Sequence, residues 1–236
     1  MDSVILKKFL YAGYIAALFM VIFLGGSWVV AQLIIQVQLG SLFPDKNTFL
    51  VVGQGLIYVV LAVLFFVTAR VLLKKKSIKD IFGLHEPTKY KYFLLVPLLF
   101  IVYAIVAGLL SALVKHLFAG FDIQQEQVTG FSFGSFDQKL IAGFMLVFLV
   151  PIFEEAVFRG WLFGFLRDKL GFWWVAVVVS AIFGYLHGQW NVAIDVFLLS
   201  LVLCWLREKT GSIWVGVSLH ALKNLIAFMI IASGMV

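Results

Sequence analysis

Charged residues are scarce in this sequence. Asp, Glu, Lys and Arg make up 13% of the 236 residues, whereas 63% are hydrophobic. A soluble domain is nearer a quarter charged, so the composition excludes an ordinary soluble protein. The formal net charge of +6 does not indicate nucleic acid, because the basic residues gather in loops, where they set topology and meet anionic lipid headgroups. We therefore predict a membrane protein that contacts the lipid bilayer and no nucleic acid.

Cysteine is nearly absent as well. Cys204 is the only one, and it lies within an apolar run. Neither a disulfide framework nor a cysteine-based metal site can therefore form. A cleavable signal is also not evident. The first apolar run extends from Phe9 to about Ile35, which exceeds the roughly 7–15 residues of a signal-peptide core. We interpret it as a retained first span.

What the chain has in abundance is long apolar runs, which predict an all-α polytopic transmembrane helix bundle of about seven spans, with six to eight compatible. The predicted spans are Phe9–Gln36, Phe49–Leu73, Tyr92–Phe118, Leu140–Leu166, Phe172–His187, Asn191–Leu206 and Ile213–Val236. We expect one structural domain overall. Residues 1–138 would form a scaffold of three spans and a basic loop, and residues 139–236 a catalytic core of four spans.

Charge in the loops predicts the topology. The stretch Lys74–Lys91 contains six lysines, so the positive-inside rule places it in the cytoplasm. The loops that begin at Arg167 and Arg207 fall on the same side if the spans alternate. The loops Gln38–Thr48 and Ala119–Gln138 lean acidic and are expected outside. We predict a cytoplasmic N-terminus and, because the chain is small and lacks organelle signals, a prokaryotic plasma membrane.

The segment Ser77–Pro87 mixes charged residues with apolar ones. This pattern is compatible with a short amphipathic helix at the membrane interface. It is equally compatible with an ordered loop, and the sequence leaves both interpretations open.

Three polar clusters interrupt the apolar runs of the second half. They are Glu154-Glu155-x-x-x-Arg159, Phe183-x-x-x-His187 and His220-x-x-x-Asn224. Ionisable groups at membrane depth are costly and usually face a protein interior or a wet cavity, where they serve function. At 1.5 Å per residue, these groups lie roughly 10 to 22 Å from the predicted cytoplasmic span ends. Polar groups from three spans in one layer indicate a built site.

The first cluster contains a candidate general base. Pro151 removes a helical hydrogen bond, so we expect a kink or local opening just before Glu154. Glu155 and Arg159 are four positions apart and share a helix face, where the arginine can neutralise the carboxylate. Glu154 is turned about 100° away from Glu155 and is left unpaired, which suits a general base or acid. Alternatively, Glu155 and Arg159 form a structural ion pair at a helix end.

The other two clusters contain candidate hydrogen-bond donors. His220 and Asn224 lie on one helix face, so both project into the same space. An imidazole and a carboxamide can donate two hydrogen bonds to a developing oxyanion, or they can join packed helices. His187 ends a predicted span and is either a catalytic group or an interhelical hydrogen-bond partner.

Lys223 lies beside the polar layer. A lysine at that depth requires a carboxylate partner. We expect Asp195 or Glu155 to supply it in a structural ion pair.

Together the three motifs resemble the CPBP family of membrane proteases. That family groups type II CAAX prenyl endopeptidases with bacteriocin-processing and immunity proteins, the Abi proteins. The resemblance covers about residues 140–230, with the residue identities and the order of the motifs intact. It implies an intramembrane endopeptidase that hydrolyses a peptide bond of a membrane-associated protein or peptide. A prenylated substrate is not implied by the residues.

The resemblance also implies residue roles. Glu154 would activate water, with His187 helping to hold it, while His220 and Asn224 would stabilise the oxyanion. The Glu155–Arg159 pair would support them. We favour this metal-free mechanism, without a cofactor.

Two alternatives stay open. Glu154, His187 and His220 could instead bind a catalytic Zn²⁺ ion, with Glu155 as the base. The same scaffold could also belong to a non-catalytic immunity or adaptor protein.

Overall fold

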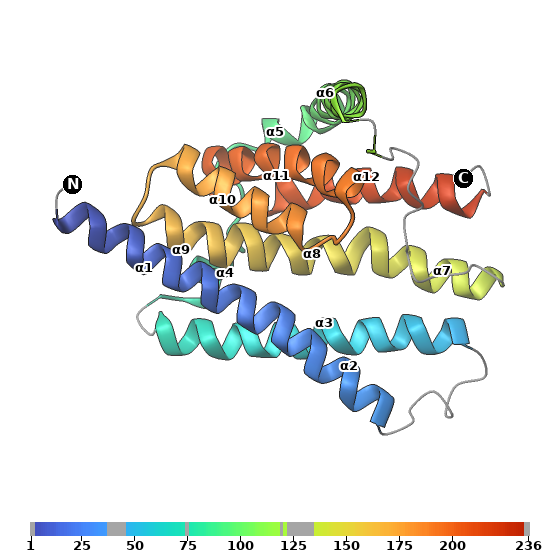
Figure 1. The fold of residues 1–236 in the computed structure, drawn as a ribbon, viewed down its shortest axis with the longest axis horizontal. Coiled ribbons are helices and arrows are strands. Elements are labelled where there is room, and N and C mark those ends of the chain that lie inside the picture. The colour runs from blue at the N-terminus through green and yellow to red at the C-terminus, as the bar shows by residue number, and fades with distance from the viewer. Residues whose placement is uncertain (1–2, 37–45, 74–75, 119, 122–134, 234–236) are drawn as a thin grey trace.

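The computed structural model describes residues 3–36, 46–73, 76–118, 120–121 and 135–233, and all regular structure within them is helical (Figure 1). The α-helices are α1 (Ser3–Met20), α2 (Gly26–Gln36), α3 (Lys46–Leu72), α4 (Ile78–Phe82), α5 (Lys91–Leu94), α6 (Val96–Leu117), α7 (Phe136–Phe144), α8 (Val150–Glu154), α9 (Gly164–Arg167), α10 (Phe172–Tyr185), α11 (Trp190–Thr210) and α12 (Trp214–Ala232). Three π-helical segments join some of them: η1 (Val21–Gly25), η3 (Met145–Leu149) and η4 (Glu155–Phe163).

The described residues include six helices long and apolar enough to cross a membrane. They are Leu6–Gln36, Val52–Leu72, Val96–Leu117, Phe136–Arg167, Trp190–Thr210 and Trp214–Ala232. The predicted fold class, a polytopic helical bundle with six to eight spans, is therefore confirmed. The predicted span Phe172–His187 corresponds to α10, which has 14 residues. At about 21 Å it is shorter than a hydrocarbon core of about 30 Å.

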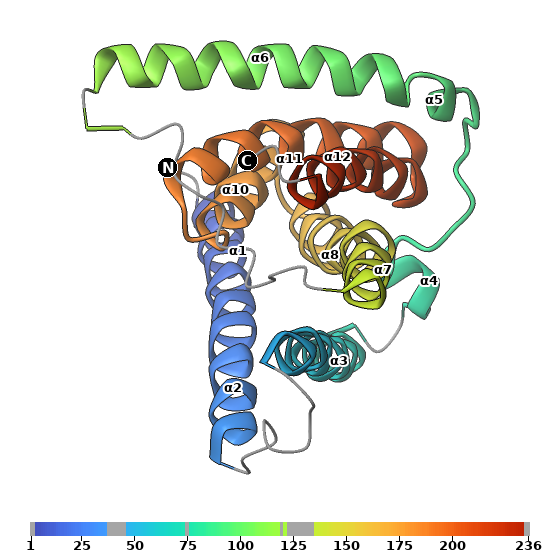
Figure 2. The same ribbon diagram turned by 90° about the vertical axis from the view of Figure 1, so that its right-hand side faces the viewer.

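The helices run in several directions. In Figure 1, α3, α12 and the long helix from α7 to α9 extend along the molecule. Helix α6 is seen end-on there and lengthwise in Figure 2, so it crosses over α11 and α12. The segment from α1 to α2 runs diagonally across the view of Figure 1 and upright beneath the horizontal α6 in Figure 2. The helix that carries Glu154 thus lies in the middle of the bundle.

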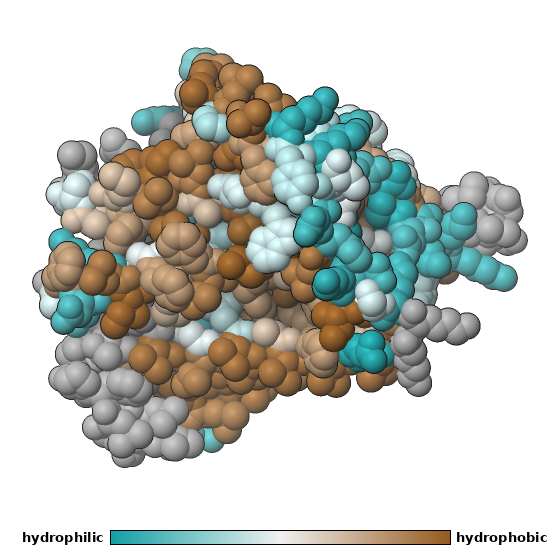
Figure 3. Space-filling model, turned by 180° about the vertical axis from the view of Figure 1, so that it is seen from behind, coloured by the Kyte–Doolittle hydropathy of each residue, from teal (hydrophilic) through white to brown (hydrophobic). Residues whose placement is uncertain are grey.

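The hydrophilic surface gathers at one end of the molecule (Figure 3). The ends of α9 and α11 and the segment that follows α3 meet there through two ion pairs, Lys76 with Asp168 and Arg167 with Glu208. This confirms that the basic loops share a side, and α1 begins at the same end (Figure 1). The compartment that this end faces stays a prediction. Lys74 and Lys75 of the basic loop lie outside the described residues, as do Asp45, Asp122 and Glu126 of the acidic loops.

An aromatic core anchors the central helix. The ring of Phe19 in α1 lies 5.0 Å from that of Phe65 in α3 and 5.0 Å from that of Phe158 in η4. Trp161, also in η4, completes the group at 5.5 Å from Phe65. All four side chains are fully buried. Since aromatic pairs at these distances stabilise beyond their buried area, this group fixes η4 against α1 and α3.

Residues 77–88, which we call the strap, close the hydrophilic end. Ser77 and Asp80 form a capping box at the start of α4, and Gly83, with φ of 65°, ends the helix. Ile81 and Phe82 are buried. The segment combines the two interpretations that the sequence left open, since a five-residue helix with a buried face, Ile78–Phe82, is followed by a non-helical stretch. Its position at a membrane interface stays a prediction. The buried face of α4 packs against η4.

The strap is also hydrogen-bonded to the turn between α11 and α12. The backbone N–H of Ile213 donates to the carbonyl of Gly83 at 3.0 Å. The hydroxyl of Ser212 donates to the carbonyl of His85 at 2.6 Å. These bonds tie the hydrophilic end of α12, which carries His220, to the same strap that packs on η4.

The close approach of strap and η4 predicts opposite effects for two neighbouring glycines. A Cβ at Gly160 would lie 2.2 Å from the carbonyl oxygen of Phe82, whereas one at Gly164 meets nothing within 4 Å. We expect Gly160→Ala to destabilise by about 1–3 kcal/mol through overpacking, and Gly164→Ala to be neutral or stabilising by up to about 1 kcal/mol. Thermal unfolding in detergent micelles measures both. Equal melting temperatures would contradict the contact.

Candidate active site

The helix that carries both glutamates changes its hydrogen-bond register just before them. The N–H of Val150 bonds to the carbonyl of Met145, five residues back. The next donor in that register would be Pro151, which has no N–H, so the carbonyl of Leu146 loses its partner. The side-chain amide of Asn224 in α12 donates to that carbonyl at 2.9 Å. The predicted opening at Pro151 is thus a widened, π-helical turn, bridged from α12.

Glu155 is the centre of a buried ionic cluster. Its Oε1 accepts a hydrogen bond from Nη1 of Arg159 at 3.0 Å and one from Nδ1 of His220 at 3.2 Å. Glu155 and Arg159 have no exposed surface. The guanidinium carbon of Arg159 lies 4.4 Å from the ring centre of Phe183, within cation–π range. The pairing expected from the spacing of Glu155 and Arg159 is confirmed, and it also holds His220.

Glu154 is also buried, with 8% of its surface exposed, but its environment differs from that of Glu155. Its Oε1 lies 3.5 Å from the hydroxyl of Tyr58, and its Oε2 lies 3.7 Å from Nε2 of His220. Close hydrogen bonds to a carboxylate are about 2.5–2.9 Å long. The carboxylate of Glu154 is therefore only loosely held, whereas that of Glu155 is tightly paired. The contrast matches the one expected from the sequence.

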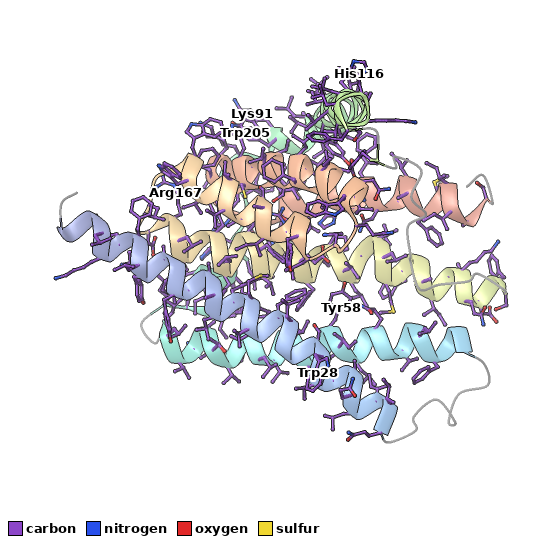
Figure 4. All side chains as sticks on the ribbon, in the orientation of Figure 1. Trp28, Tyr58, Lys91, His116, Arg167 and Trp205 are labelled. Atoms are coloured by element: carbon purple, nitrogen blue, oxygen red, sulfur yellow. The ribbon has the colours of Figure 1, made fainter. Side chains whose placement is uncertain are left out.

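Tyr58 is a site residue that the sequence reasoning missed, because it lies in the predicted scaffold. Figure 4 shows its side chain pointing from α3 toward the helix that carries Glu154. Its ring packs edge-on against Phe153 at 5.0 Å. The available signal was Gln54, four positions earlier: two polar side chains on one face of an apolar helix indicate a polar neighbour.

His187 follows the end of α10 and is half-buried. Its Nδ1 lies 2.7 Å from the carbonyl oxygen of Phe183. Because a carbonyl only accepts, Nδ1 carries the proton, and Nε2 is the nitrogen that can accept one. The Phe183 ring packs against His187 at 4.8 Å and against His220 at 5.9 Å. The ring of Phe183 therefore lies between the two imidazoles and keeps them apart.

Two cavities meet at Glu154. The larger, of about 330 Å³, extends toward α12 and is lined by His220, Lys223 and Asn224 among others. The smaller, of about 200 Å³, extends toward α2 and α10. Four residues line both cavities: Gln54, Tyr58, Glu154 and His187. The structure thus brings together all four candidate catalytic residues, Glu154, His187, His220 and Asn224, around the larger cavity.

Lys223 forms the expected ion pair with Asp195 rather than with Glu155. Its Nζ lies 3.8 Å from Oδ2 of Asp195. The hydroxyl of Tyr103 in α6 donates to the other oxygen of that carboxylate at 2.7 Å. This network joins α6, α11 and α12 beside the larger cavity.

The alternative zinc ligands are Glu154, His187 and His220. Within the described residues, no group of three His, Cys, Asp or Glu side chains converges closely enough to hold a metal ion. Both ring nitrogens of His220 face carboxylate oxygens, an arrangement that suits proton exchange. The metal-free mechanism and its zinc-dependent alternative both stay predictions.

Comparison with known proteins finds a family match over part of the chain. Residues 136–226 match the family model described as "Type II CAAX prenyl endopeptidase Rce1-like". This interval contains all three motifs, and the resemblance that they predict is confirmed. A Bacillus subtilis (strain 168) protein named "Putative membrane peptidase YdiL" is 31% identical over 74 residues, which are 31% of this chain and 30% of that relative. No solved structure matches the chain.

Because the ionic cluster is buried, we expect two arginine substitutions to lower the free energy of unfolding by very different amounts. Arg159→Met leaves the buried Glu155 carboxylate without its guanidinium and should destabilise by about 3–5 kcal/mol. Arg167→Met breaks the partly exposed pair with Glu208 and should cost at most about 1 kcal/mol. Unfolding by added sodium dodecyl sulfate in mixed micelles compares the variants. Similar losses would argue against the buried cluster as a stabilising unit.

Proposed function

We propose that this chain, whose residues 136–226 match the Rce1-like family model, is an intramembrane endopeptidase in which Glu154 activates water. The observation that carries the proposal is the contrast between adjacent glutamates. Glu155 is paired with Arg159 and His220, while Glu154 is buried beside two cavities without a close hydrogen bond. A carboxylate held in this way is available to accept a proton, which is what a general base requires.

In the proposed reaction, Glu154 removes a proton from a water molecule while the oxygen of that water attacks the scissile carbonyl carbon. The carbonyl oxygen becomes an oxyanion. The proton then passes to the amide nitrogen, the C–N bond breaks, and an amine and a carboxylic acid leave. Both ring nitrogens of His220 face carboxylate oxygens, Nδ1 toward Glu155 and Nε2 toward Glu154, so His220 lies where a proton can be exchanged with the base.

His220 and Asn224 are the proposed oxyanion donors. Glu155 accepts from Nδ1 of His220 and so directs Nε2 toward Glu154 and the larger cavity. As an imidazolium, His220 has a hydrogen on both ring nitrogens, so that Nε2–H can donate to the oxyanion. The amide nitrogen of Asn224 has two hydrogens, of which one bonds to Leu146, so the second can also donate. Two such donors typically contribute several kcal/mol to transition-state stabilisation.

The proposed substrate is a membrane-associated peptide or protein that enters the larger cavity. A volume of about 330 Å³ accommodates a short extended peptide segment, and the apolar lining residues Met145, Val150 and Phe228 suit aliphatic side chains. We further propose that the basic end faces the cytoplasm of a prokaryotic cell, as the positive-inside rule predicts.

Glu154→Gln tests the proposed base. The substitution keeps the shape of the side chain and removes its proton-accepting carboxylate, so cleavage should fall to background. Membranes from cells that express the wild type or the variant are compared by enrichment of newly formed peptide termini. Glu86→Gln is the matched control, because Glu86 lies in the exposed strap and should leave cleavage unchanged. Termini present only with the wild type and the control would identify a substrate and its cut site.

Equal terminus profiles at equal expression would reject peptidase activity under these conditions. The non-catalytic immunity or adaptor function would then be the better explanation of the polar layer. Wild-type levels of cleavage by the Glu154→Gln variant would instead reject Glu154 as the base.

Metal removal separates the glutamate mechanism from the zinc-dependent alternative. We expect purified protein dialysed against EDTA to cleave the identified peptide at an unchanged rate, because no proposed step uses a metal. The rate is measured before dialysis, after dialysis and after addition of Zn²⁺. Loss of activity that Zn²⁺ restores would replace the proposed mechanism with the metal-dependent one.

A further inference from the structure

We propose that the smaller cavity is a water site that supplies the hydrolytic water to Glu154 while peptide occupies the larger cavity. This inference rests on the proposed function. It assigns the two spaces that meet at Glu154 to the two reactants of a hydrolysis, and it gives α2 and α3 a part in the site.

The carboxylate of Glu154 has few close hydrogen-bond partners. Its nearest polar groups are the hydroxyl of Tyr58 at 3.5 Å and Nε2 of His220 at 3.7 Å. A buried carboxylate that lacks close donors is strongly unfavourable. Polar contacts longer than about 3.5 Å are commonly bridged by water. The hydrogen bond from Tyr58 is long, and the contact with His220 exceeds hydrogen-bond distance, so Glu154 can accept further hydrogen bonds from water in either cavity.

The size and lining of the smaller cavity suit water. Its volume of about 200 Å³ corresponds to about six molecules at the 30 Å³ of liquid water. Besides Glu154, four polar side chains line it: Ser27, Gln54, Tyr58 and His187. Each ordered water needs two to four polar partners, and this set supplies them. The remaining lining residues are apolar, namely Phe23, Ile57, Leu61, Phe158, Phe183 and Leu186, so the proposed water lies along the polar side of the cavity, next to Glu154.

The smaller cavity also differs in position from the proposed peptide site. The proposed oxyanion donors, His220 and Asn224, line only the larger cavity. A peptide bound to them displaces water from that space. The smaller cavity remains in contact with Glu154 through the shared wall formed by Gln54, Tyr58 and His187. It can therefore hold water next to the base during the reaction and replace each molecule consumed.

Ser27 is the residue through which the smaller cavity can be altered without touching the proposed catalytic groups. It lies in α2, and its hydroxyl donates to the carbonyl of Phe23 at 2.6 Å. It lines the smaller cavity but not the larger one. A larger apolar side chain at this position would fill part of the space and remove one polar partner of the water.

Hydration is tested directly with a nitrile probe. p-Cyanophenylalanine is incorporated at Phe23, which lines the smaller cavity, and separately at Phe19. Phe19 stacks on Phe23 at 6.1 Å but is fully buried in the aromatic core. A nitrile that accepts hydrogen bonds from water absorbs at a higher wavenumber than one in apolar surroundings. We expect the higher value at position 23 only. Equal wavenumbers at both positions would show a dry cavity and overturn the proposal.

The supply role is tested kinetically with the peptide identified from the wild-type and Glu154→Gln comparison. We expect Ser27→Leu to lower kcat by roughly tenfold or more and to change KM by less than about twofold, because peptide binding is untouched. Ser111→Leu makes the same substitution in α6 and is the control for a merely structural effect. An unchanged kcat for Ser27→Leu would overturn the supply role. A raised KM with unchanged kcat would instead assign the cavity to a substrate side chain.

The nitrile and kinetic measurements distinguish a failure of the water site from a failure of the proposed function. The nitrile measurement does not depend on cleavage. A hydrated smaller cavity in a protein that cleaves nothing rejects the proposed function and, with it, the supply role. A dry cavity in an active peptidase rejects the water site alone.

Discussion

The burial of Glu155 constrains the rest of the structure. A carboxylate with no exposed surface is tolerated only with opposite charge and hydrogen bonds nearby, and here Arg159 and His220 supply both at Oε1. The arrangement needs η4 and α12 side by side. Gly216 permits this, because a Cβ at that position would lie 3.0 Å from Oε2 of Glu155. The aromatic core and the strap hold η4 and α12 in this position from outside the site.

This tight pairing is what allows the neighbouring Glu154 to remain loosely held. If Arg159 or His220 were shared equally by both carboxylates, neither would be available as a base. The helical offset between consecutive residues sends the two side chains in different directions. One points to the ionic cluster, the other to the space where the cavities meet. Two adjacent residues of one type thus acquire different chemistry from their surroundings, as in other sites with paired acids.

Local features of this chain were predictable from its sequence, whereas contacts between distant segments were not. Hydrophobic runs predicted the helices, and the i, i+4 rule predicted the Glu155–Arg159 pair. Both depend on regular helical geometry. Tyr58 was missed because its contact with Glu154 joins residues 96 positions apart, and single-sequence patterns do not encode such pairs. The length of α10 was overestimated by two residues, because Leu186 continues its apolar run and His187 was included as its last residue, whereas the turn that contains Gly188, with φ of 71°, already begins after Tyr185.

Asn224 shows why motif residues can combine structural and chemical roles. Pro151 leaves the carbonyl of Leu146 without a backbone donor, and the amide of Asn224 replaces it from another helix. In a bilayer such a replacement is needed, because lipid offers no hydrogen-bond donor. The same bond fixes the amide at the wall of the larger cavity, one helical turn after His220. The proline before the glutamates and the asparagine after the histidine are therefore two halves of one interaction. Because it orients an amide group with a second hydrogen, it links the folding of the widened helix to the proposed binding of the oxyanion.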